Sequence, residues 1–343
     1  MPRRARVVVT GGAGFVGSHL CEALLDGGAE VVCVDNLSTG RLSNLEHCLE
    51  SARFTFLDRD IVQPFDVEGR VDGIVHLASP ASPMDYQADP IGTLEVGSIG
   101  TLRVLRLAEA KGARLVYAST SEVYGDPLVH PQVETYWGNV NPIGPRSMYD
   151  ESKRFGEAAV AAFRHERGVD AAIVRIFNTF GPRMRPHDGR AIPTFISQAL
   201  AGVPLTVTGS GEQTRSICYV SDLVDGLRAM LASEHPGPIN LGNPHEISMH
   251  DLAVWIRTLS GSESELRFIE SPGDDPQMRR PDIGTARDVL GWEPGVSAEA
   301  GLRRTIDWFR REESTDAAPT PSLSGSEQED SGTALGAGLG SAR

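Results

Sequence analysis

The sequence is poor in cysteine, in long apolar runs and in clustered positive charge, and each shortage excludes a class of protein. Its 343 residues include four cysteines, Cys21, Cys33, Cys48 and Cys218, which are irregularly spaced and form no Cys-x-x-Cys pair. This spacing predicts neither a disulfide framework nor a zinc site, and it favours a reducing compartment, the cytoplasm. We therefore expect no metal ion.

Membranes and nucleic acids are also not expected as partners. No apolar stretch reaches the roughly 18 residues of a membrane span, and the basic start of the chain is followed by an apolar run too short for a signal peptide. The formal net charge is -14 at pH 7, and no run rich in Lys and Arg is present. The hydrophobic content of 40% is ample for one large domain or two of ordinary size.

Short β-branched segments alternate with amphipathic segments through the first half of the chain. We predict strands at residues 6–10, 29–34, 53–57, 73–77, 113–118 and 171–177, and helices at 16–26, 100–110 and 149–167. This alternation is typical of the α/β class, in which a parallel, doubly wound Rossmann sheet is covered by helices on both faces.

The first predicted strand leads into a glycine-rich turn. Gly11, Gly14 and Gly17 fit the pattern G-x-x-G-x-x-G, which permits a tight turn, close approach of the backbone to a pyrophosphate and close packing of the next helix. The N–H groups at the start of that helix attract the anion. Asp35 ends the second strand 18 residues after Gly17, where a carboxylate binds the adenine ribose and repels a 2′-phosphate. The sequence therefore predicts a site for NAD rather than NADP.

Beyond Gly181, glycine, proline and arginine become dense and the segments shorten. Helices are predicted there at residues 192–201, 220–232, 249–259 and 297–311. We interpret 1–180 as mainly the NAD-binding domain and 181–311 as mainly a smaller C-terminal α/β substrate-binding domain over the carboxyl edge of the sheet. Residues 312–343 contain no aromatic side chain and predict a disordered acidic tail, because they cannot bury enough apolar area to offset their ordering entropy.

A tyrosine and a lysine lie four residues apart on the predicted helix 149–167. This spacing puts Tyr149 and Lys153 on one face of that helix. We expect the lysine ammonium to lower the pKa of the tyrosine, which could then take a proton from a sugar hydroxyl while hydride leaves for the nicotinamide. Such pairs also occur by chance on solvated helices, so this pair needs support from elsewhere in the chain.

That support lies in residues 118–125, which follow a buried strand at the carboxyl edge of the sheet. Turn chemistry is a sufficient explanation for Ser119. Thr120, Ser121 and Glu122 are better candidates for catalysis, because a carboxylate at a strand end in a cleft must be paired, hydrated or used.

Together, these motifs resemble the extended short-chain dehydrogenase/reductase family of the NAD-dependent epimerase/dehydratase type. More narrowly, several stretches look like those of the UDP-glucuronate decarboxylases. They are residues 76–83, 119–149, 178–184, 213–216, 240–244, 274–276 with 280–282, and 290–294. The similarity covers about residues 6–311.

The resemblance implies NAD-dependent decarboxylation of UDP-glucuronate to UDP-xylose, through oxidation at C4, loss of carbon dioxide from a β-keto acid and re-reduction by the resident cofactor. Tyr149 would be the base for the C4 hydroxyl, Lys153 would modify its pKa and contact the ribose, and Thr120 would hydrogen-bond O4. Glu122 would handle protons or orient the sugar ring.

The resemblance also implies the binding residues. The UDP-sugar would be anchored by Asn178 and Arg215, with Arg190 and Arg280 as secondary candidates. Besides Gly11, Gly14, Gly17 and Asp35, the expected cofactor contacts are Phe15, Val16, Asn36, Asp60, Ile61, Leu77, Ala78, Ser79, Tyr149 and Lys153. A homodimer formed by the helices 100–110 and 149–167 is also implied, although their apolar faces are equally compatible with ordinary core packing.

Two other functions stay open at this point. A 4-epimerase or a 4,6-dehydratase of another nucleotide sugar is the first, but dehydratases carry an acid where Ser121 stands, and epimerases carry a small or hydroxyl residue where Glu122 stands. A non-catalytic NAD-binding sensor is the second, and the presence of Thr120, Tyr149 and Lys153 counts against it.

Three residues depart from the pattern of the family. Gly92 replaces a frequent lysine, Gly97 replaces a frequent asparagine, and Ser152 replaces a frequent glycine or alanine. These departures put the identity of the sugar in question more than the class of reaction.

Overall fold

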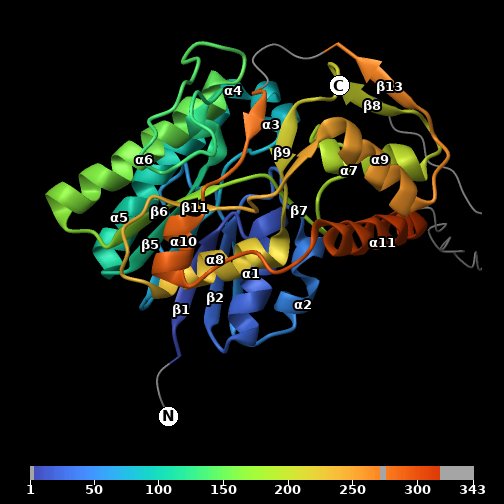
Figure 1. Cartoon of the computed structure of the whole chain (residues 1–343). Helices are drawn as coiled ribbons and strands as arrows, with labels where there is room; N and C mark the ends of the chain where they lie inside the picture. The colour runs from blue at the N-terminus through green and yellow to red at the C-terminus, as the bar shows by residue number, and fades with distance from the viewer. Residues whose placement is uncertain (1–3, 271–275, 317–343) are drawn as a thin grey trace, which may run out of the picture.

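A computed structural model describes residues 4–270 and 276–316 (Figure 1). Its centre is a seven-stranded parallel sheet with the strand order β11-β6-β5-β4-β1-β2-β3. The strands of this sheet are β1 (Arg6–Thr10), β2 (Glu30–Asp35), β3 (Phe54–Asp58), β4 (Gly73–His76), β5 (Arg114–Thr120), β6 (Ala171–Ile176) and β11 (Ile239–Leu241). The chain winds outward in both directions from the β1–β4 boundary, which confirms the predicted doubly wound α/β fold.

The sheet is buried on both faces, which explains why its strands are continuously apolar. In β1, Val7 and Val9 face one core and Val8 faces the other. Helices α1 (Phe15–Asp26) and α8 (Val220–Ala232) contribute to the first core, and α5 (Thr101–Lys111) and α6 (Ser147–Arg167) contribute to the second. Alternate side chains of a strand point to opposite faces, so a strand covered on both sides has no polar face to show in its sequence.

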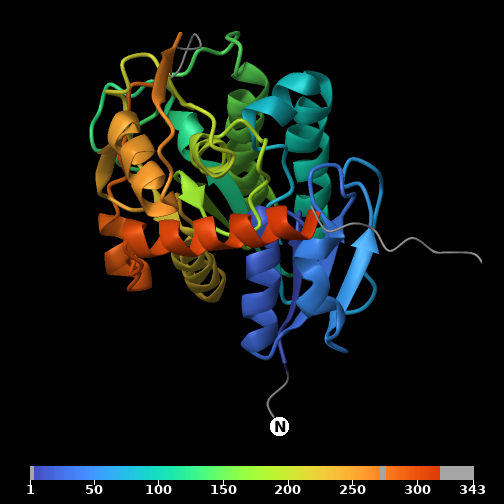
Figure 2. The same cartoon turned by 90° about the vertical axis from the view of Figure 1, so that its right-hand side faces the viewer.

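The remaining elements form a smaller unit beside the carboxyl edge of the sheet. Its helices α7 (Ala191–Leu200), α9 (Met249–Ser260) and α11 (Ala298–Asp316) pack against one another. Figure 2 shows α11, in red, running across the molecule beside the orange helix α9. The short strands of this unit are β7 (Thr179–Phe180), β8 (Leu205–Thr208), β9 (Thr214–Ser216), β10 (Cys218–Tyr219), β12 (Glu246–Ser248), β13 (Leu266–Ile269) and β14 (Met278–Arg279). The chain does not divide cleanly at residue 181, because α8, β11 and α10 (Gly284–Leu290) return to the main sheet.

Several predicted boundaries differ from those observed. The helix predicted at 100–110 is preceded by α4 (Pro90–Glu95) and a π-helical turn, η2 (Val96–Gly100), so that helical backbone begins at Pro90. Short elements that were not predicted are η1 (Leu42–Leu45), α2 (Glu46–Leu49), α3 (Pro83–Ala88) and η3 (Ser121–Tyr124).

The C-terminal boundary differs as well. Helix α11 continues to Asp316, so the first five residues of the predicted tail are helical; residues 317–343 and the Asp274-Asp275 pair of the sequence resemblance lie outside the described residues. Within the described ranges, no helix is long and apolar enough to cross a membrane.

Candidate active site

The glycine-rich turn between β1 and α1 forms a cradle that side chains would fill. Gly11 has a φ of +73°, and a Cβ on it would lie 2.7 Å from the backbone nitrogen of Ala78. A Cβ on Gly17 would collide with the carbonyl oxygen of Gly11, while the N–H of Gly14 donates to that oxygen at 3.2 Å. The residues present therefore fit a bound pyrophosphate, whose approach needs bare backbone at the start of a helix.

Asp35 stands where β2 ends, beside this cradle. Its carboxylate accepts hydrogen bonds from the N–H of Ala13 at 2.9 Å and from the N–H of Leu37 at 2.8 Å. Burial raises the pKa of Asp35, and these two N–H donors oppose that rise. The side chain is thus fixed at the β2 end of the cradle, the place expected for a ribose contact.

A single cavity of about 790 Å³ joins the cradle to the catalytic candidates. Its lining includes every residue predicted to contact the cofactor, as well as Thr120, Ser121 and Glu122. Such a cavity lies where ligands of open α/β sheets bind, outside the carboxyl ends of the strands.

Tyr149 and Lys153 face this cavity from the first turns of α6. Both side chains are buried, and the Nζ of Lys153 donates to the carbonyl oxygen of Ala118 at 2.9 Å while lying 5.8 Å from the centre of the Tyr149 ring. Burial lowers the pKa of Lys153 to about 8. The predicted effect on the tyrosine is not observed in the protein alone, because burial and the charge of Glu122 raise the pKa of Tyr149 above its usual value. The ammonium of Lys153 is directed to a backbone carbonyl and does not offset these two effects.

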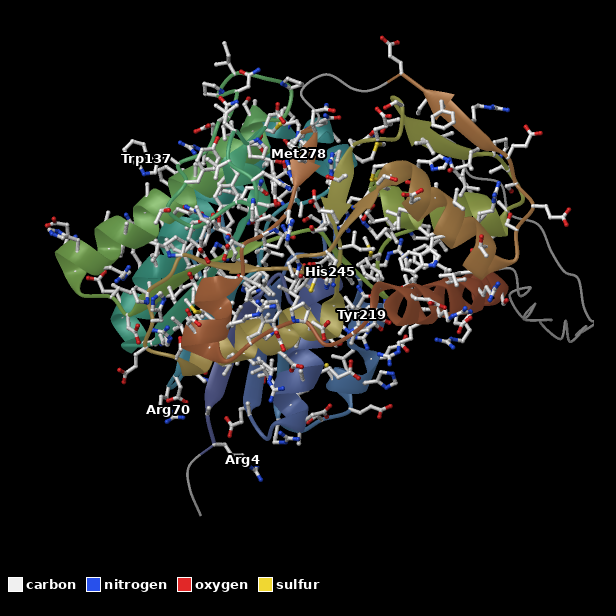
Figure 3. The ribbon with its side chains drawn as sticks, in the orientation of Figure 1. Arg4, Arg70, Trp137, Tyr219, His245 and Met278 are labelled. Carbon is white, nitrogen blue, oxygen red and sulfur yellow. The ribbon has the colours of Figure 1, made fainter. Side chains whose placement is uncertain are left out.

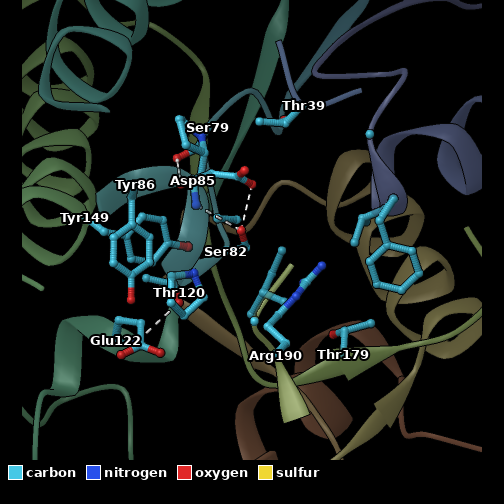
Figure 4. A pocket seen from close by; sticks show the side chains of 18 of the residues that line it. Thr39, Ser79, Ser82, Asp85, Tyr86, Thr120, Glu122, Tyr149, Thr179 and Arg190 are labelled. Atoms are coloured by element: carbon cyan, nitrogen blue, oxygen red, sulfur yellow. Dashed lines mark hydrogen bonds between the residues drawn. The ribbon is translucent and has the colours of Figure 1, made fainter. Parts of the chain in front are cut away.

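Thr120 links the strand end to the reactive pair. It is the last residue of β5, and its hydroxyl caps the following turn by accepting from the N–H of Glu122 at 3.2 Å. It also hydrogen-bonds with Tyr149, which lowers the pKa of that phenol against the opposing effect of burial. The Thr120 hydroxyl and the Tyr149 hydroxyl thus meet at one point of the cavity (Figure 4).

A second tyrosine, which the sequence analysis missed, stacks on the first. The ring of Tyr86 lies 5.2 Å from that of Tyr149 at an interplanar angle of 12° (Figure 4). Tyr86 is buried in α3, and its hydroxyl has no hydrogen-bond partner among the residues that the structure describes. An unsatisfied buried hydroxyl that lines a cavity is ready to bond a ligand there.

Glu122 is held by two arginines from distant parts of the chain. Both Nη atoms of Arg279 pair with its carboxylate, and the Nη2 of Arg146 pairs with it at 2.6 Å. Burial alone would raise the pKa of Glu122, but the charges of Arg279 and Arg146 prevail and lower it to about 2. Glu122 is therefore an anion in the ligand-free protein and holds no proton to give. Neither arginine was predicted as a site residue.

One predicted anchor does not reach the cavity. Arg280 is absent from the lining, and its Nη1 lies 3.9 Å from Glu246 on the outer side. Its neighbour Arg279, the last residue of the short strand β14, lines the cavity. The role of Arg280 as an anchor stays a prediction, and Arg279 is a further candidate.

The other three anchors do line the cavity. Asn178 lines it next to β7, and Arg215 lines it from β9. Arg190 pairs with the buried Asp188 through its Nε at 2.8 Å, and its guanidinium lies 5.8 Å from the ring centre of Phe15, so it stands beside the dinucleotide cradle (Figure 4). Among the described residues no group of three or more His, Cys, Asp or Glu side chains could hold a metal ion.

The two glycine departures lie away from the reacting groups. Neither Gly92 nor Gly97 lines the cavity. The N–H of Gly92 donates to Asp89 at 2.9 Å, which caps the start of α4. The handling of a carboxylate therefore has to be sought in Glu122 and its arginines.

A glycine cradle at the head of a Rossmann sheet, joined by one cavity to Thr120, Tyr149 and Lys153, defines a dehydrogenase-type site of the short-chain class. Comparison places the chain more narrowly. It belongs to the NAD-dependent epimerase/dehydratase family, whose model matches residues 7–242. This confirms the predicted family, and with it NAD as the cofactor.

Curated relatives carry the comparison further. The chain is 55% identical over 309 residues to UDP-glucuronic acid decarboxylase 1 of Xenopus tropicalis, covering 90% of this chain and 73% of that protein. It is 50% identical over 308 residues to UDP-glucuronic acid decarboxylase 1 of Arabidopsis thaliana, covering 90% of this chain and 70% of the other. Among solved structures, it is similar to UDP-glucuronic acid 4-epimerase of Bacillus cereus in complex with UDP-glucuronic acid and NAD, with a TM-score of 0.80 and 28% identity over 90% of this chain and 99% of the epimerase.

Proposed function

We propose that this protein decarboxylates UDP-glucuronate to UDP-xylose and retains NAD through the cycle. The observation that carries the proposal is the grouping of Glu122, Arg279 and Arg146 beside Thr120 and Tyr149. Arginines at this place suit a uronic acid, because guanidinium groups pair with carboxylates in two-point geometry. Relatives at 50% identity or more that are named UDP-glucuronic acid decarboxylases support it.

The hydroxyl groups of the site have different roles at C4 of the sugar. Tyr149 would first lose its own proton to solvent and would then, as the phenolate, receive the proton of the C4 hydroxyl, while Thr120 and Tyr86 hold the oxygen in place. NAD, which the cradle of Gly11, Gly14 and Gly17 would hold, would supply the acceptor for hydride from C4 and its donor at the end of the cycle. The 4-keto group makes the C5 carboxylate a β-keto acid, so the bond between C5 and the carboxylate breaks, carbon dioxide leaves, and the electron pair moves onto O4. The hydroxyls of Thr120 and Tyr149 stabilise this enolate until C5 takes up a proton from water, and Tyr149 gives its proton back to O4 when hydride returns to C4.

Neither alternative reaction accounts for the set of groups in this site. Elimination of water needs an acid beside C5 and C6, and Ser121 offers a hydroxyl there. Simple inversion at C4 needs no charged cluster beside the ring, yet Glu122 and two arginines stand there. Because the structural neighbour named a UDP-glucuronic acid 4-epimerase shares the fold, epimerisation is the alternative that an assay has to separate.

The predicted anchoring residues bind two different ligands, the substrate and the cofactor. Asn178 and Arg215 would hold the diphosphate of the UDP-sugar. Arg190 would serve the cofactor phosphates, because its guanidinium lies over Phe15 of the cradle.

A direct assay tests the proposed function. Purified protein is incubated with UDP-glucuronate labelled with ¹³C at the carboxylate, and carbon dioxide and nucleotide products are followed by NMR. We expect labelled carbon dioxide and UDP-xylose in equal amounts, without net consumption of NAD. Recovery of unchanged substrate, or of UDP-galacturonate alone, would contradict the proposal.

We further propose the homodimer predicted on the helices 100–110 and 149–167, with its surface extended onto α4, which precedes the first of them, and a cytoplasmic location. Helices α4 and α6 contact each other and expose apolar side chains, with Ile91 at 70%, Leu94 at 43% and Phe155 at 41% exposure. Trp137, 90% exposed, projects from the loop beside α6, where its carbonyl oxygen accepts from Arg154 (Figure 3). All four cysteines are free thiols, which suits a reducing compartment. Light scattering should give twice the mass of one chain. Ile91→Glu should reduce the measured mass to that of a single chain.

A further inference from the structure

Lys153 is a buried cation with few polar partners. It is 6% exposed, and its ammonium donates to the carbonyl oxygen of Ala118 at 2.9 Å. No carboxylate of the described residues pairs with this ammonium. A charge that is taken out of water needs compensation close by. One backbone carbonyl supplies part of it, so the rest has to come from other groups around the Nζ of Lys153.

The ring of Tyr117 on β5 lies next to this ammonium. The Nζ of Lys153 is 5.5 Å from the centre of the Tyr117 ring, and the Tyr117 hydroxyl donates to the carbonyl oxygen of Lys153 at 3.4 Å. A cation within about 6 Å of the face of a tyrosine ring is attracted by the negative face of that ring, most strongly where water is excluded. Tyr117 is 1% exposed and does not line the cavity, whereas Lys153 does. Tyr117 therefore acts on a ligand through Lys153.

Helix α6 has a gap in its surface that admits the Tyr117 ring. A Cβ on Gly156 would collide with the hydroxyl and the ring of Tyr117. Glycine is unfavourable inside a helix, yet Gly156 stands in the interior of a helix of 21 residues. The missing side chain lets the ring approach α6 closely, one turn away from Lys153.

A neutral histidine packs beside Tyr117. His76 of β4 lies opposite Tyr117 in the register of the sheet, and the two ring centres are 5.6 Å apart. The two ring nitrogens of His76 hydrogen-bond with the hydroxyls of Thr10 at 2.7 Å and Thr101 at 3.2 Å. Burial, together with the charge of Lys153, lowers the pKa of His76 to about 3. His76 therefore carries no charge that would repel the ammonium.

The other titratable groups around Lys153 are neutral or turned to other partners. Burial raises the pKa of Tyr149, on the same helix, and that of Tyr117, so both are neutral phenols. The charged groups of α6 and of the elements packed against it are directed elsewhere: Asp150 of α6 faces Arg146, Glu122 of η3 pairs with Arg279, Asp85 of α3 pairs with Arg185, Arg175 of β6 pairs with Glu157, Arg103 of α5 donates to the carbonyl oxygen of Val62, and Glu95 of α4 is exposed. The rings of Tyr117 and Tyr149 thus complete the compensation of Lys153.

We infer that Tyr117 is a positioning residue for Lys153, whose ammonium its ring holds charged and in place at the carbonyl of Ala118, on the wall of the cavity. The inference rests on the proposed function, in which Lys153 contacts the ribose of the cofactor and assists Tyr149. Tyr117 touches neither ligand in this role. It fixes the place and the charge of the residue that does.

The sign of one change separates this role from simple packing. If the ring is removed while the volume is kept, the ammonium stays buried but loses compensation. The pKa of Lys153, which burial already lowers to about 8, then falls further. If Tyr117 only fills space, its replacement leaves this pKa unchanged, or raises it by admitting water.

An NMR titration of the lysine side chains tests this difference. The sequence contains two lysines, Lys111 and Lys153, so protein labelled with ¹³C at the lysine Cε gives two lysine signals, and Lys111→Arg identifies the first. Tyr117→Leu is combined with Gly156→Ala, whose methyl group refills the gap. We expect this double variant to lower the pKa measured for Lys153 by about 0.5–1.5, which corresponds to the usual strength of a buried cation–ring contact. An unchanged or higher pKa overturns the inference.

Two control variants are available in the same chain. Tyr117→Phe keeps the ring and should leave the titration of Lys153 close to that of the unaltered protein, because a phenylalanine ring also has a negative face. Phe163→Leu removes a ring from the same core, about 15 Å further along α6, and should have no effect. If either control lowers the pKa of Lys153 as much as the double variant does, the ring of Tyr117 is not the cause and the inference fails.

A measurement on the unaltered protein keeps the inference testable if the double variant does not fold. A nuclear Overhauser contact is expected between the Cε hydrogens of Lys153 and the ring hydrogens of Tyr117, and its absence overturns the inference.

Turnover gives the functional readout where the double variant folds. The alkaline limb of kcat should move to lower pH, while the KM of UDP-glucuronate changes by less than about twofold, because Tyr117 does not line the cavity. A limb that does not move overturns the role of Tyr117 in turnover. The proposed function fails separately, because the titrations need no substrate. A protein that releases no carbon dioxide refutes the decarboxylase, whereas a decarboxylase in which Lys153 titrates unchanged in the double variant refutes only the role of Tyr117.

Discussion

Ser152 occupies the space that a side chain at position 97 would need. A Cβ on Gly97 would collide with the Cβ of Ser152 and lie 2.8 Å from its hydroxyl oxygen. That hydroxyl donates to the carbonyl oxygen of Tyr149 at 2.8 Å, so Ser152 is fixed against the helix that carries the reactive tyrosine. Compared with the family pattern, the side chain at 97 is smaller and the side chain at 152 is larger. The two departures therefore compensate each other in volume at this contact between helices.

We expect the two positions to be energetically coupled. Gly97→Ala should reduce the free energy of unfolding by about 1–3 kcal/mol, because it overpacks a buried contact. Ser152→Gly should cost about 1 kcal/mol, because glycine is a poor helix residue. The double variant should be more stable than the sum of the two losses predicts, by about 1 kcal/mol or more. Denaturant titrations of all four proteins check this, and strict additivity would show that the contact is not shared.

The phenol of Tyr149 is expected to be needed for chemistry and not for cofactor binding. Tyr149→Phe should lower kcat by about 10²–10⁴-fold, the usual effect of removing a general base, while the Kd of NAD changes little. The cradle that holds NAD is formed by other residues, and the stacked ring is kept.

Tyr136→Phe serves as the control for this prediction. Its hydroxyl accepts the N–H of Leu128 outside the cavity, and its loss should leave turnover within about twofold, as for surface changes remote from a site. Full turnover by Tyr149→Phe would remove Tyr149 from the role of base.

A buried carboxyl next to the tyrosine makes the stability of the protein depend on pH. Burial first, and then the charge of Glu122, raise the pKa of Asp150 to about 7, against the opposing charges of Arg146 and Arg279. Its Oδ1 has no hydrogen-bond partner among the described residues. In the unfolded chain this carboxyl loses its proton near pH 4. The folded state is therefore penalised progressively as the pH rises from about 4 to about 7, and the full penalty remains above pH 7.

Asp150→Asn removes the carboxyl group whose ionisation destabilises the folded state. The variant should be more stable than the parent at pH 8, by about 1–3 kcal/mol, and equal to it within error at pH 4. Thermal melts at the two pH values check the difference. Glu151→Gln, at the adjacent and more exposed position, should show no such pH-dependent gain. A gain for Asp150→Asn that is as large at pH 4 as at pH 8 would exclude titration of Asp150 as its cause.

The sequence predicts some parts of this site well and others not at all, for physical reasons. The cradle at Gly11 and Gly17 could be predicted because it depends on local spacing along a strand, turn and helix. Arg279 could not be predicted as a lining residue, because its two-residue strand β14 shows no periodicity from which its faces could be inferred.

Contacts between segments that are distant in the chain also could not be predicted from the sequence. The Arg279–Glu122 pair joins positions 157 residues apart, and nothing local to either residue marks it. Tyr86 was missed for a different reason: its helix α3 spans only six residues, too few for a hydrophobic period to appear. The raised pKa of Tyr149 shows the same limit, since burial and remote charge outweigh the neighbour four residues away.

The last prediction concerns how the cofactor is kept in place. Two walls of the cavity, residues 82–86 and 183–190, are joined by an ion pair between Asp85 and Arg185. The hydroxyl of Ser82 donates to the same carboxylate at 2.7 Å, and a Cβ on Gly189 would lie 2.8 Å from the side chain of Met84. Both walls line the cavity that includes the cradle, and we expect that opening this junction widens the exit for a bound dinucleotide.

Asp85→Asn should therefore speed the release of NAD by about three- to thirtyfold, because loss of a partly buried charge pair acts mainly on dissociation rates. The rate is measured by chasing bound NADH fluorescence with excess NAD. Asp85→Asn combined with Arg185→Gln should release the cofactor no faster than either change alone, since both break one pair. Glu293→Gln, which breaks the exposed pair with Arg287 far from the cavity, should have no effect. If Asp85→Asn releases the cofactor at the rate of the unaltered protein, the two walls do not limit its escape.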